Sequence, residues 1–207
     1  MKFESGSEID SAHCTALTHE YFRCHDYFTH FAELGERMIL SGRTKELSYR
    51  TYNAYAGFVH HLYEFLMGCY ARELGDTEII SSKGKRHEKE KILDSMVYSS
   101  VQRVMNKRKT AIEKGYAPEW ENHISCYTQP VPREFPEEFR KCRNKISGHV
   151  SYKRASELSL TNFYREYHKY LYLLYQDSTY FWGKKEGEFP DLKEITEFSL
   201  MLEEKNA

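Results

Sequence analysis

The segment KCRNKISGHV, residues 141–150, brings together Arg143, Asn144 and His149. An arginine guanidinium stays charged and offers a planar fork of donors that fits a phosphate group. A histidine titrates near neutrality, so it can take up or release a proton at physiological pH. Because the 2′-hydroxyl of RNA is an internal nucleophile, these side chains could support phosphodiester cleavage without a metal ion.

These residues fall near the end of a predicted short helix. Its first turn contains Pro136 followed by acidic residues, and its buried stripe consists of Phe139, Cys142 and Ile146. If the helix continued, His149 would lie about 9 Å along the axis from Arg143 and about 120° around it. Gly148 is expected to end the helix instead, and a left-handed turn there would bring the imidazole back toward Arg143 or toward a second subunit.

The plain alternative is an arginine on a solvated helix face and a histidine that closes a turn. Glu64 could pair with Arg143, or with another basic residue, as a buried polar partner. Geometry discriminates between the two interpretations. Exposed Arg143 and His149 that lie close together and face a groove favour an enzyme, whereas a buried salt bridge to either residue disfavours it.

Helical periodicity runs through the chain, and no strand pattern or repeat competes with it. We therefore expect an all-α bundle of five or six helices. The predicted segments are 17–39, 48–74, 87–114, the short helix that ends at Gly148, 160–181 and a final amphipathic segment, 191–204.

Several residues are candidates for helix ends or for close packing. Ser11 or Thr18 could cap the first helix, and Thr161 the helix at 160–181. Gly57 and Gly68 lie inside the second predicted helix, where each is about 1 kcal/mol less favourable than alanine. These two positions could admit a close neighbour.

The stretch of residues 115–136 has no helical period and holds four of the five prolines. A connection of this length in a compact domain is often a lid or a binding loop. The other interpretation, which we favour, is a packed cover anchored by Trp120 and Tyr127.

Composition sets limits on the class of protein. The net charge is −1, but residues 83–114 carry ten Lys or Arg against four Asp or Glu, whereas residues 186–205 carry two against seven. Five cysteines without a C-x-x-C pair indicate reduced thiols and a cytoplasmic protein. No segment approaches the ~18 apolar residues of a membrane-spanning helix.

Other residue groups carry weaker predictions. His60, His61 and Glu64 suggest a metal site, although a polar His60 among packed aromatic rings is the favoured interpretation. Lys107, Arg108 and Lys109 could contact phosphates or simply form a solvated helix end. A tyrosine series could stack on bases but is more typical of a core or a dimer interface: Tyr164, Tyr167, Tyr170, Tyr172 and Tyr175. No glycine-rich phosphate loop and no G-x-S-x-G occurs.

The run RNKISGH resembles the R-x(4–6)-H motif of the HEPN superfamily, the "higher eukaryotes and prokaryotes nucleotide-binding" domains. The spacing is five residues, and Asn144 matches the polar residue that commonly follows the arginine there. The placement near the end of a late helix, before another long helix, is also similar. The resemblance divides a single all-α domain, 1–207, into an N-terminal helix extension at 1–44, a HEPN-like core at 45–182 and an acidic C-terminal helix or tail at 183–207.

The resemblance implies a metal-independent endoribonuclease with no cofactor, acting in a toxin–antitoxin, phage-defence or RNA-processing system. Arg143 and His149 would be catalytic and Asn144 would orient them. The implied partners are RNA, a second copy of the chain whose motif completes one cleft, and an antitoxin or other partner protein. Some members of the superfamily lack activity, so a non-catalytic RNA- or protein-binding module is the alternative.

Overall fold

The computed structural model describes residues 2–77, 79, 86–147, 159–182, 195, 198, 199 and 201. Within this part the chain is helical, which confirms the prediction of an all-α bundle, and one isolated β-bridge joins Lys2 to Asp76. No helix in these residues is long and apolar enough to cross a membrane. The helices are α1 (Glu8–Ser41), α2 (Lys45–Glu73), α3 (Arg86–Glu113), the short 3-10 helix η1 (Ile124–Tyr127), α4 (Phe135–Ser147) and α6 (Leu160–Trp182).

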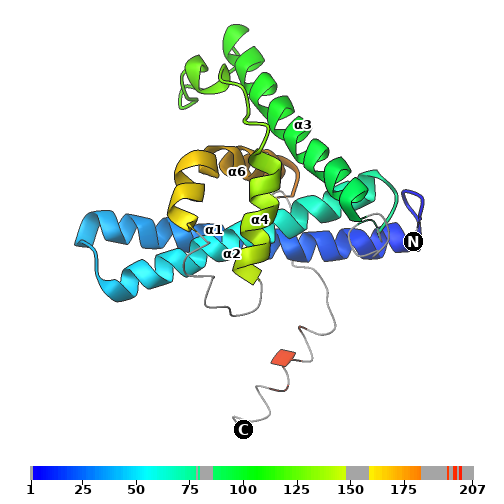
Figure 1. Ribbon diagram of the computed structural model, residues 1–207, viewed down its shortest axis with the longest axis horizontal. Coiled ribbons are helices and arrows are strands. Elements are labelled where there is room, and N and C mark those ends of the chain that lie inside the picture. The colour runs from blue at the N-terminus through cyan, green and yellow to red at the C-terminus, as the bar shows by residue number, and fades with distance from the viewer. Residues whose placement is uncertain are drawn as a thin grey trace.

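Helices α1 and α2 form a long antiparallel hairpin along the longest axis of the molecule (Figure 1). The predicted caps for α1, Ser11 and Thr18, are wrong, because the helix begins earlier. Ser7 Oγ accepts a hydrogen bond from Asp10 N, and Asp10 Oδ2 accepts one from Gly6 N at 2.7 Å. Such reciprocal bonds satisfy donors that the first helical turn leaves unpaired.

Glycines in α2 allow α1 to approach closely, as their positions in the predicted helix suggested. A Cβ atom added at Gly57 would lie 2.2 Å from the Tyr27 ring, and one at Gly68 would lie 2.6 Å from Leu17 Cδ2. Both distances are shorter than any normal carbon contact. The missing side chains therefore set the spacing between the two helices of the hairpin.

Helix α3 runs diagonally away from the hairpin, and the chain then returns through residues 114–134 to α4, which crosses the hairpin (Figure 1). Tyr127 is buried, as expected for an anchor of this connection, but Trp120 is 70% exposed, so its predicted anchoring role is wrong. The second anchor is polar: buried Glu121 pairs with Arg108 and accepts a hydrogen bond from the Tyr127 hydroxyl.

Helix α6 packs against both α3 and α4. Ser159 Oγ accepts a hydrogen bond from Asn162 N, so Ser159 and not Thr161 caps its start. Of the predicted segment 191–204, only Ile195, Phe198, Ser199 and Met201 lie in the described part; the others fall outside it.

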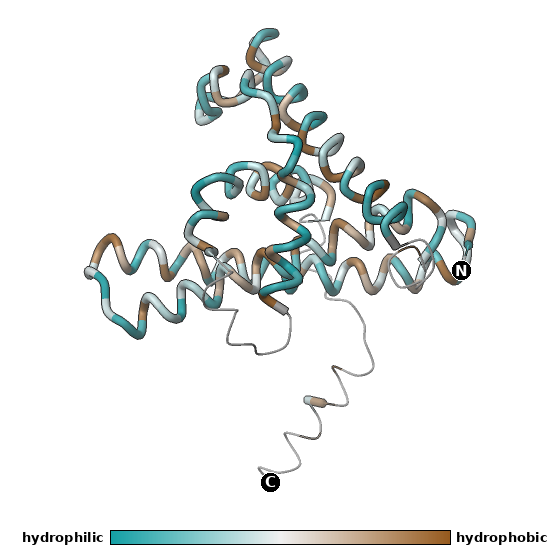
Figure 2. The backbone as a smooth tube through the Cα atoms, viewed as in Figure 1, coloured by the Kyte–Doolittle hydropathy of each residue, from teal (hydrophilic) through white to brown (hydrophobic). Residues whose placement is uncertain are grey.

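One hydrophobic core joins all five helices, and Figure 2 shows hydrophobic and hydrophilic positions interleaved along each of them. Aromatic rings are numerous in it because tyrosine can bury its ring and keep its hydroxyl near polar groups. Fully or almost fully buried large side chains include Tyr21, Phe58, Phe65, Phe135, Phe139 and Tyr170.

Candidate functional site

Helix α4 holds Arg143 against the hairpin. Its apolar face is buried through Phe139 and Cys142, which agrees with the predicted stripe. On its α3 side, Arg140 donates two hydrogen bonds to Asp94, at 3.0 and 3.2 Å. The helix is therefore fixed both in position and in rotation, and the residue after Cys142 is directed toward α2.

The Arg143 guanidinium has partners on both α2 and α4. Its Nε donates to Glu64 Oε1, Nη2 pairs with the same carboxylate oxygen, and Nη1 donates to Asn144 Oδ1 at 3.1 Å. The guanidinium carbon also lies 5.7 Å from the centre of the Tyr63 ring. Within the described part of the chain, three of the five N–H donors of Arg143 are engaged in this way, which leaves one on each Nη atom.

Arg143 is neither fully exposed nor part of a buried salt bridge, which are the two opposing conditions of the sequence-based test. It forms a salt bridge, but 29% of its side chain is exposed and so is 28% of Glu64, so the pair is not buried. It also lines a groove. His149 lies outside the described residues, so the structure gives no distance between Arg143 and His149.

The groove lies between α1, α2 and α4 and has a volume of about 400 Å³. This volume falls within the usual range for small-molecule sites. Most of its lining is ionisable, with charges of both signs. The groove residues are His13, Ala16, Leu17, Glu20, Arg23, His60, His61, Glu64, Gly68 and Arg143.

A carboxylate–imidazole pair lies in the same groove. His61 Nδ1 is 2.6 Å from Glu20 Oε1, so an ionised Glu20 accepts the Nδ1 proton. The Tyr27 ring stacks on His61 with a centroid distance of 5.0 Å and an interplanar angle of 22°. Tyr27 is the residue that occupies the space above Gly57, so close packing of the hairpin also fixes the orientation of this imidazole.

The neighbouring histidines differ in their surroundings. His60 lies with its ring centre 4.8 Å from that of His61. Burial, together with the nearby His61 and Arg143, lowers the pKa of His60, and burial is the main cause of the lowered pKa of His19. His13 Nε2 is 2.9 Å from the Gly68 carbonyl oxygen and therefore acts as a donor. His60 and His19 consequently favour the neutral form at pH 7.

The metal interpretation of His60, His61 and Glu64 gains no support from the arrangement. Among the described residues, no group of three or more His, Cys, Asp or Glu side chains converges as metal ligands would. Glu64 is engaged with Arg143, and His61 Nδ1 with Glu20.

The basic run on α3 makes intramolecular contacts. Lys107 pairs with Asp177, Arg108 with Glu121, and Lys109 with Glu113. Arg108 also donates to Gln176, so it connects α3 to α6. These ion pairs and this hydrogen bond indicate a structural role for the basic run. In the tyrosine series, Tyr170 and Tyr175 are core residues, while Tyr164 is 42% exposed.

Glu20 is one of the ionisable groove residues that sequence reasoning missed, together with His13 and Arg23. Glu20 lies between Leu17 and Tyr21, two buried positions of α1, and this is the only local signal it carries. A carboxylate beside a buried stripe is a candidate for a polar contact with the facing helix. Its partner, 41 residues away, could not be identified from that pattern.

Comparison of the chain with protein families, with curated proteins and with solved structures found no match.

Proposed function

We propose that this protein is an endoribonuclease of the HEPN type that cleaves RNA without a metal ion. The 2′-oxygen forms a bond to the adjacent phosphorus, and the bond from phosphorus to the 5′-oxygen breaks. The 2′-hydroxyl proton passes to a base, and the leaving 5′-oxygen receives a proton from an acid. The products are a 2′,3′-cyclic phosphate and a 5′-hydroxyl.

The observation that carries the proposal is the setting of Arg143 at the groove. Glu64 and Asn144 orient its guanidinium, and two N–H donors remain for the oxygens of a phosphate. A positioned cation of this kind balances the charge that develops on phosphorus in the transition state. In this proposal Asn144 positions Arg143, and His149 transfers a proton.

The ion pair with Glu64 sets a condition on phosphate binding. A phosphate that binds Arg143 must share it with the Glu64 carboxylate, which has the same sign of charge, or displace that carboxylate, so the strength of the ion pair sets the cost of binding. The same pair favours the second candidate function, a non-catalytic RNA- or protein-binding module, because it gives Arg143 a structural role in the free protein.

The proposed partners are RNA and a second copy of the chain. A toxin–antitoxin or phage-defence setting would add an antitoxin protein. The dimer enters the proposal because the motif resemblance implies a cleft built from two copies.

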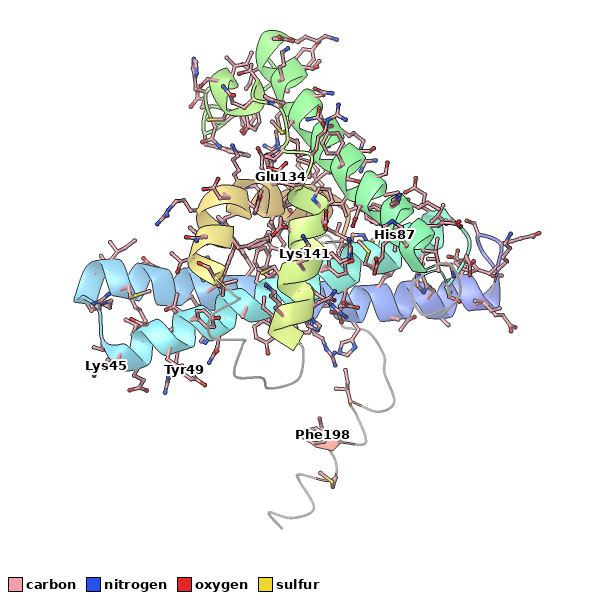
Figure 3. All side chains as sticks on the ribbon, viewed as in Figure 1. Lys45, Tyr49, His87, Glu134, Lys141 and Phe198 are labelled. Carbon is pink, nitrogen blue, oxygen red and sulfur yellow. The ribbon has the colours of Figure 1, made fainter. Side chains whose placement is uncertain are left out.

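The test is cleavage of a mixed RNA pool in EDTA by wild type, Arg143→Ala and His149→Ala. We expect wild type to yield 2′,3′-cyclic phosphate ends and each variant to lose about 100-fold or more of the rate. Lys141→Ala is the matched control on α4, because Lys141 is exposed and pairs with Glu137 and Glu138 outside the groove (Figure 3).

The fold of each variant is checked by circular dichroism. Absence of cleavage by concentrated wild type contradicts the proposal and favours the binding module. Cleavage that persists in both folded variants places the active site elsewhere or points to a contaminating nuclease.

A further inference from the structure

We propose that His61, oriented by Glu20, is the general base that removes the 2′-hydroxyl proton in this groove. The inference rests on the proposed function and adds a catalytic residue to it. Cleavage with a cyclic phosphate product requires two proton transfers at opposite sides of the phosphorus. The sequence motif supplies one imidazole, His149, and the groove supplies a second.

The bond to Glu20 determines which nitrogen of His61 can act as the base. Glu20 Oε1 lies 2.6 Å from Nδ1 and accepts its proton. The neutral imidazole therefore carries its lone pair on Nε2, where a hydroxyl proton can be taken up. When Nε2 is protonated, the carboxylate stabilises the imidazolium, as in other carboxylate–histidine pairs.

The pair is shielded but accessible from the groove. The His61 side chain is 14% exposed and that of Glu20 is 20% exposed. Partial removal from water strengthens the interaction of the carboxylate with a developing imidazolium. The stacked Tyr27 ring limits rotation of the imidazole, so a single orientation is available before substrate binds.

His61 lies close to the proposed phosphate site along α2. It precedes Glu64 by three residues, which is about 4.5 Å along the helix axis, and Glu64 holds Arg143. Both His61 and Arg143 line the same groove of about 400 Å³. A phosphate bound to Arg143 would therefore have its adjacent ribose within reach of His61.

The other histidines of the groove are less suitable. The lowered pKa of His60 makes it a weaker base, and His13 donates its Nε2 proton to a backbone carbonyl. The charged and titratable groups around His61 are His19, Glu20, Arg23 and Tyr27 of α1, His60 and Glu64 of α2, and Arg143 of α4.

The reaction balances with these groups. His61 Nε2 takes the 2′-hydroxyl proton as the 2′-oxygen bonds to phosphorus, and Arg143 neutralises the phosphate oxygens. The phosphorus–5′-oxygen bond breaks, and the leaving oxygen takes up a proton from the acid of the proposed function or from water. No oxidant, reductant or further reactant is required.

The experiment compares wild type, His61→Ala, Glu20→Gln and the control His30→Ala, which alters an exposed histidine of the same α1 helix as Glu20. Cleavage rates of the RNA pool are measured between pH 5 and 9 in EDTA. Binding is measured with 2′-O-methyl RNA, which cannot be cleaved by this route. We expect His61→Ala to lower the rate by about 10²–10⁴-fold while binding changes little.

Glu20→Gln provides a readout that a structural role would not give. Without the carboxylate the imidazolium is less stable, so the acid limb of the pH–rate profile should move to lower pH. If His61→Ala does not fold, this shift decides the question, and an unchanged limb overturns the inference.

The remaining outcomes separate the two proposals. If wild type cleaves, Arg143→Ala does not, and folded His61→Ala cleaves like wild type, His61 is not the base and the proposed function stands. If wild type does not cleave, both proposals fall.

Discussion

Two polar side chains of the groove are oriented by hydrogen-bond partners from another helix or from the next residue in sequence. Arg143 is held by Glu64 and Asn144, and His61 by Glu20. Such support orients a functional group before a ligand arrives, which lowers the entropic cost of reaching the reactive geometry. It also explains how an arginine can be paired in the free protein and still present donors to a phosphate.

A half-buried histidine outside the groove gives a prediction for stability. His168 stacks on Tyr164 with a centroid distance of 4.4 Å, and within the described part of the chain its Nδ1 has no hydrogen-bond partner. Burial lowers the pKa of His168 from 6.5 to about 4. Between pH 6.5 and about pH 4, the unfolded chain therefore binds a proton at His168 that the folded protein does not bind.

We expect the contribution of neutral His168 to the free energy of unfolding to be fully present above pH 6.5 and to be lost as the pH falls toward 4. The loss should total on the order of 2 kcal/mol, reduced from the full linkage value because part of the ring is exposed. Urea unfolding of wild type and His168→Phe across this range measures it. The variant should show a shallower pH dependence, and identical slopes would contradict the assignment.

At the scale of the helices, the groove depends on close packing within the α1–α2 hairpin. Tyr27 fits over Gly57 and also covers His61, so one contact links helix spacing to the candidate site. Helix propensity alone favours alanine over glycine by about 1 kcal/mol at an interior position. Glycine nevertheless suits position 57, because the Tyr27 ring leaves no room there for a methyl group.

We expect Gly57→Ala to be about 1–3 kcal/mol less stable than Gly35→Ala, since the added methyl group must displace the Tyr27 ring. Gly35 is a matched control in α1, because a Cβ atom there meets nothing within 4 Å. Denaturant unfolding gives both free energies. Equal changes in the free energy of unfolding for the two variants would show that the Tyr27 ring moves aside without cost.

At the scale of the whole molecule, α4 crosses the α1–α2 hairpin (Figure 1). The groove is lined by residues of these three helices. His149 follows the end of α4 in the sequence. In the proposed dimer, a second copy would contribute its own motif to the same cleft.

Mixing inactive variants tests the shared cleft. If each site uses Arg143 of one protomer and His149 of the other, random exchange between Arg143→Ala and His149→Ala subunits should restore about a quarter of wild-type activity. Half of the dimers would be mixed, and one of the two sites in each would be complete. Sedimentation velocity checks that dimers exist and exchange, and no recovery in exchanging dimers would contradict a shared site.

The sequence by itself determined the helices and much of their buried faces. The stripe of Phe139 and Cys142 followed from spacing of three and four residues, because each turn of an α-helix brings those positions to one face. Gly57 and Gly68 suggested only that a close neighbour could be admitted, and the packed hairpin shows that the neighbours are Tyr27 and Leu17. Helix starts were less predictable. Ser7 and Ser159 cap their helices through individual side-chain hydrogen bonds, for which several nearby serines and threonines compete in the sequence.

Only the tertiary structure decided which polar side chains meet. The Glu20–His61 and Glu64–Arg143 pairs join residues 41 and 79 positions apart. The sequence offered Glu64 as one possible partner of Arg143, but no local periodicity selects either pair. Their contact depends on the distance and rotation between packed helices, which are set by the many apolar contacts of the shared core and by the missing side chain at Gly57. The chemistry of the groove is for this reason a property of the packed hairpin and α4 together.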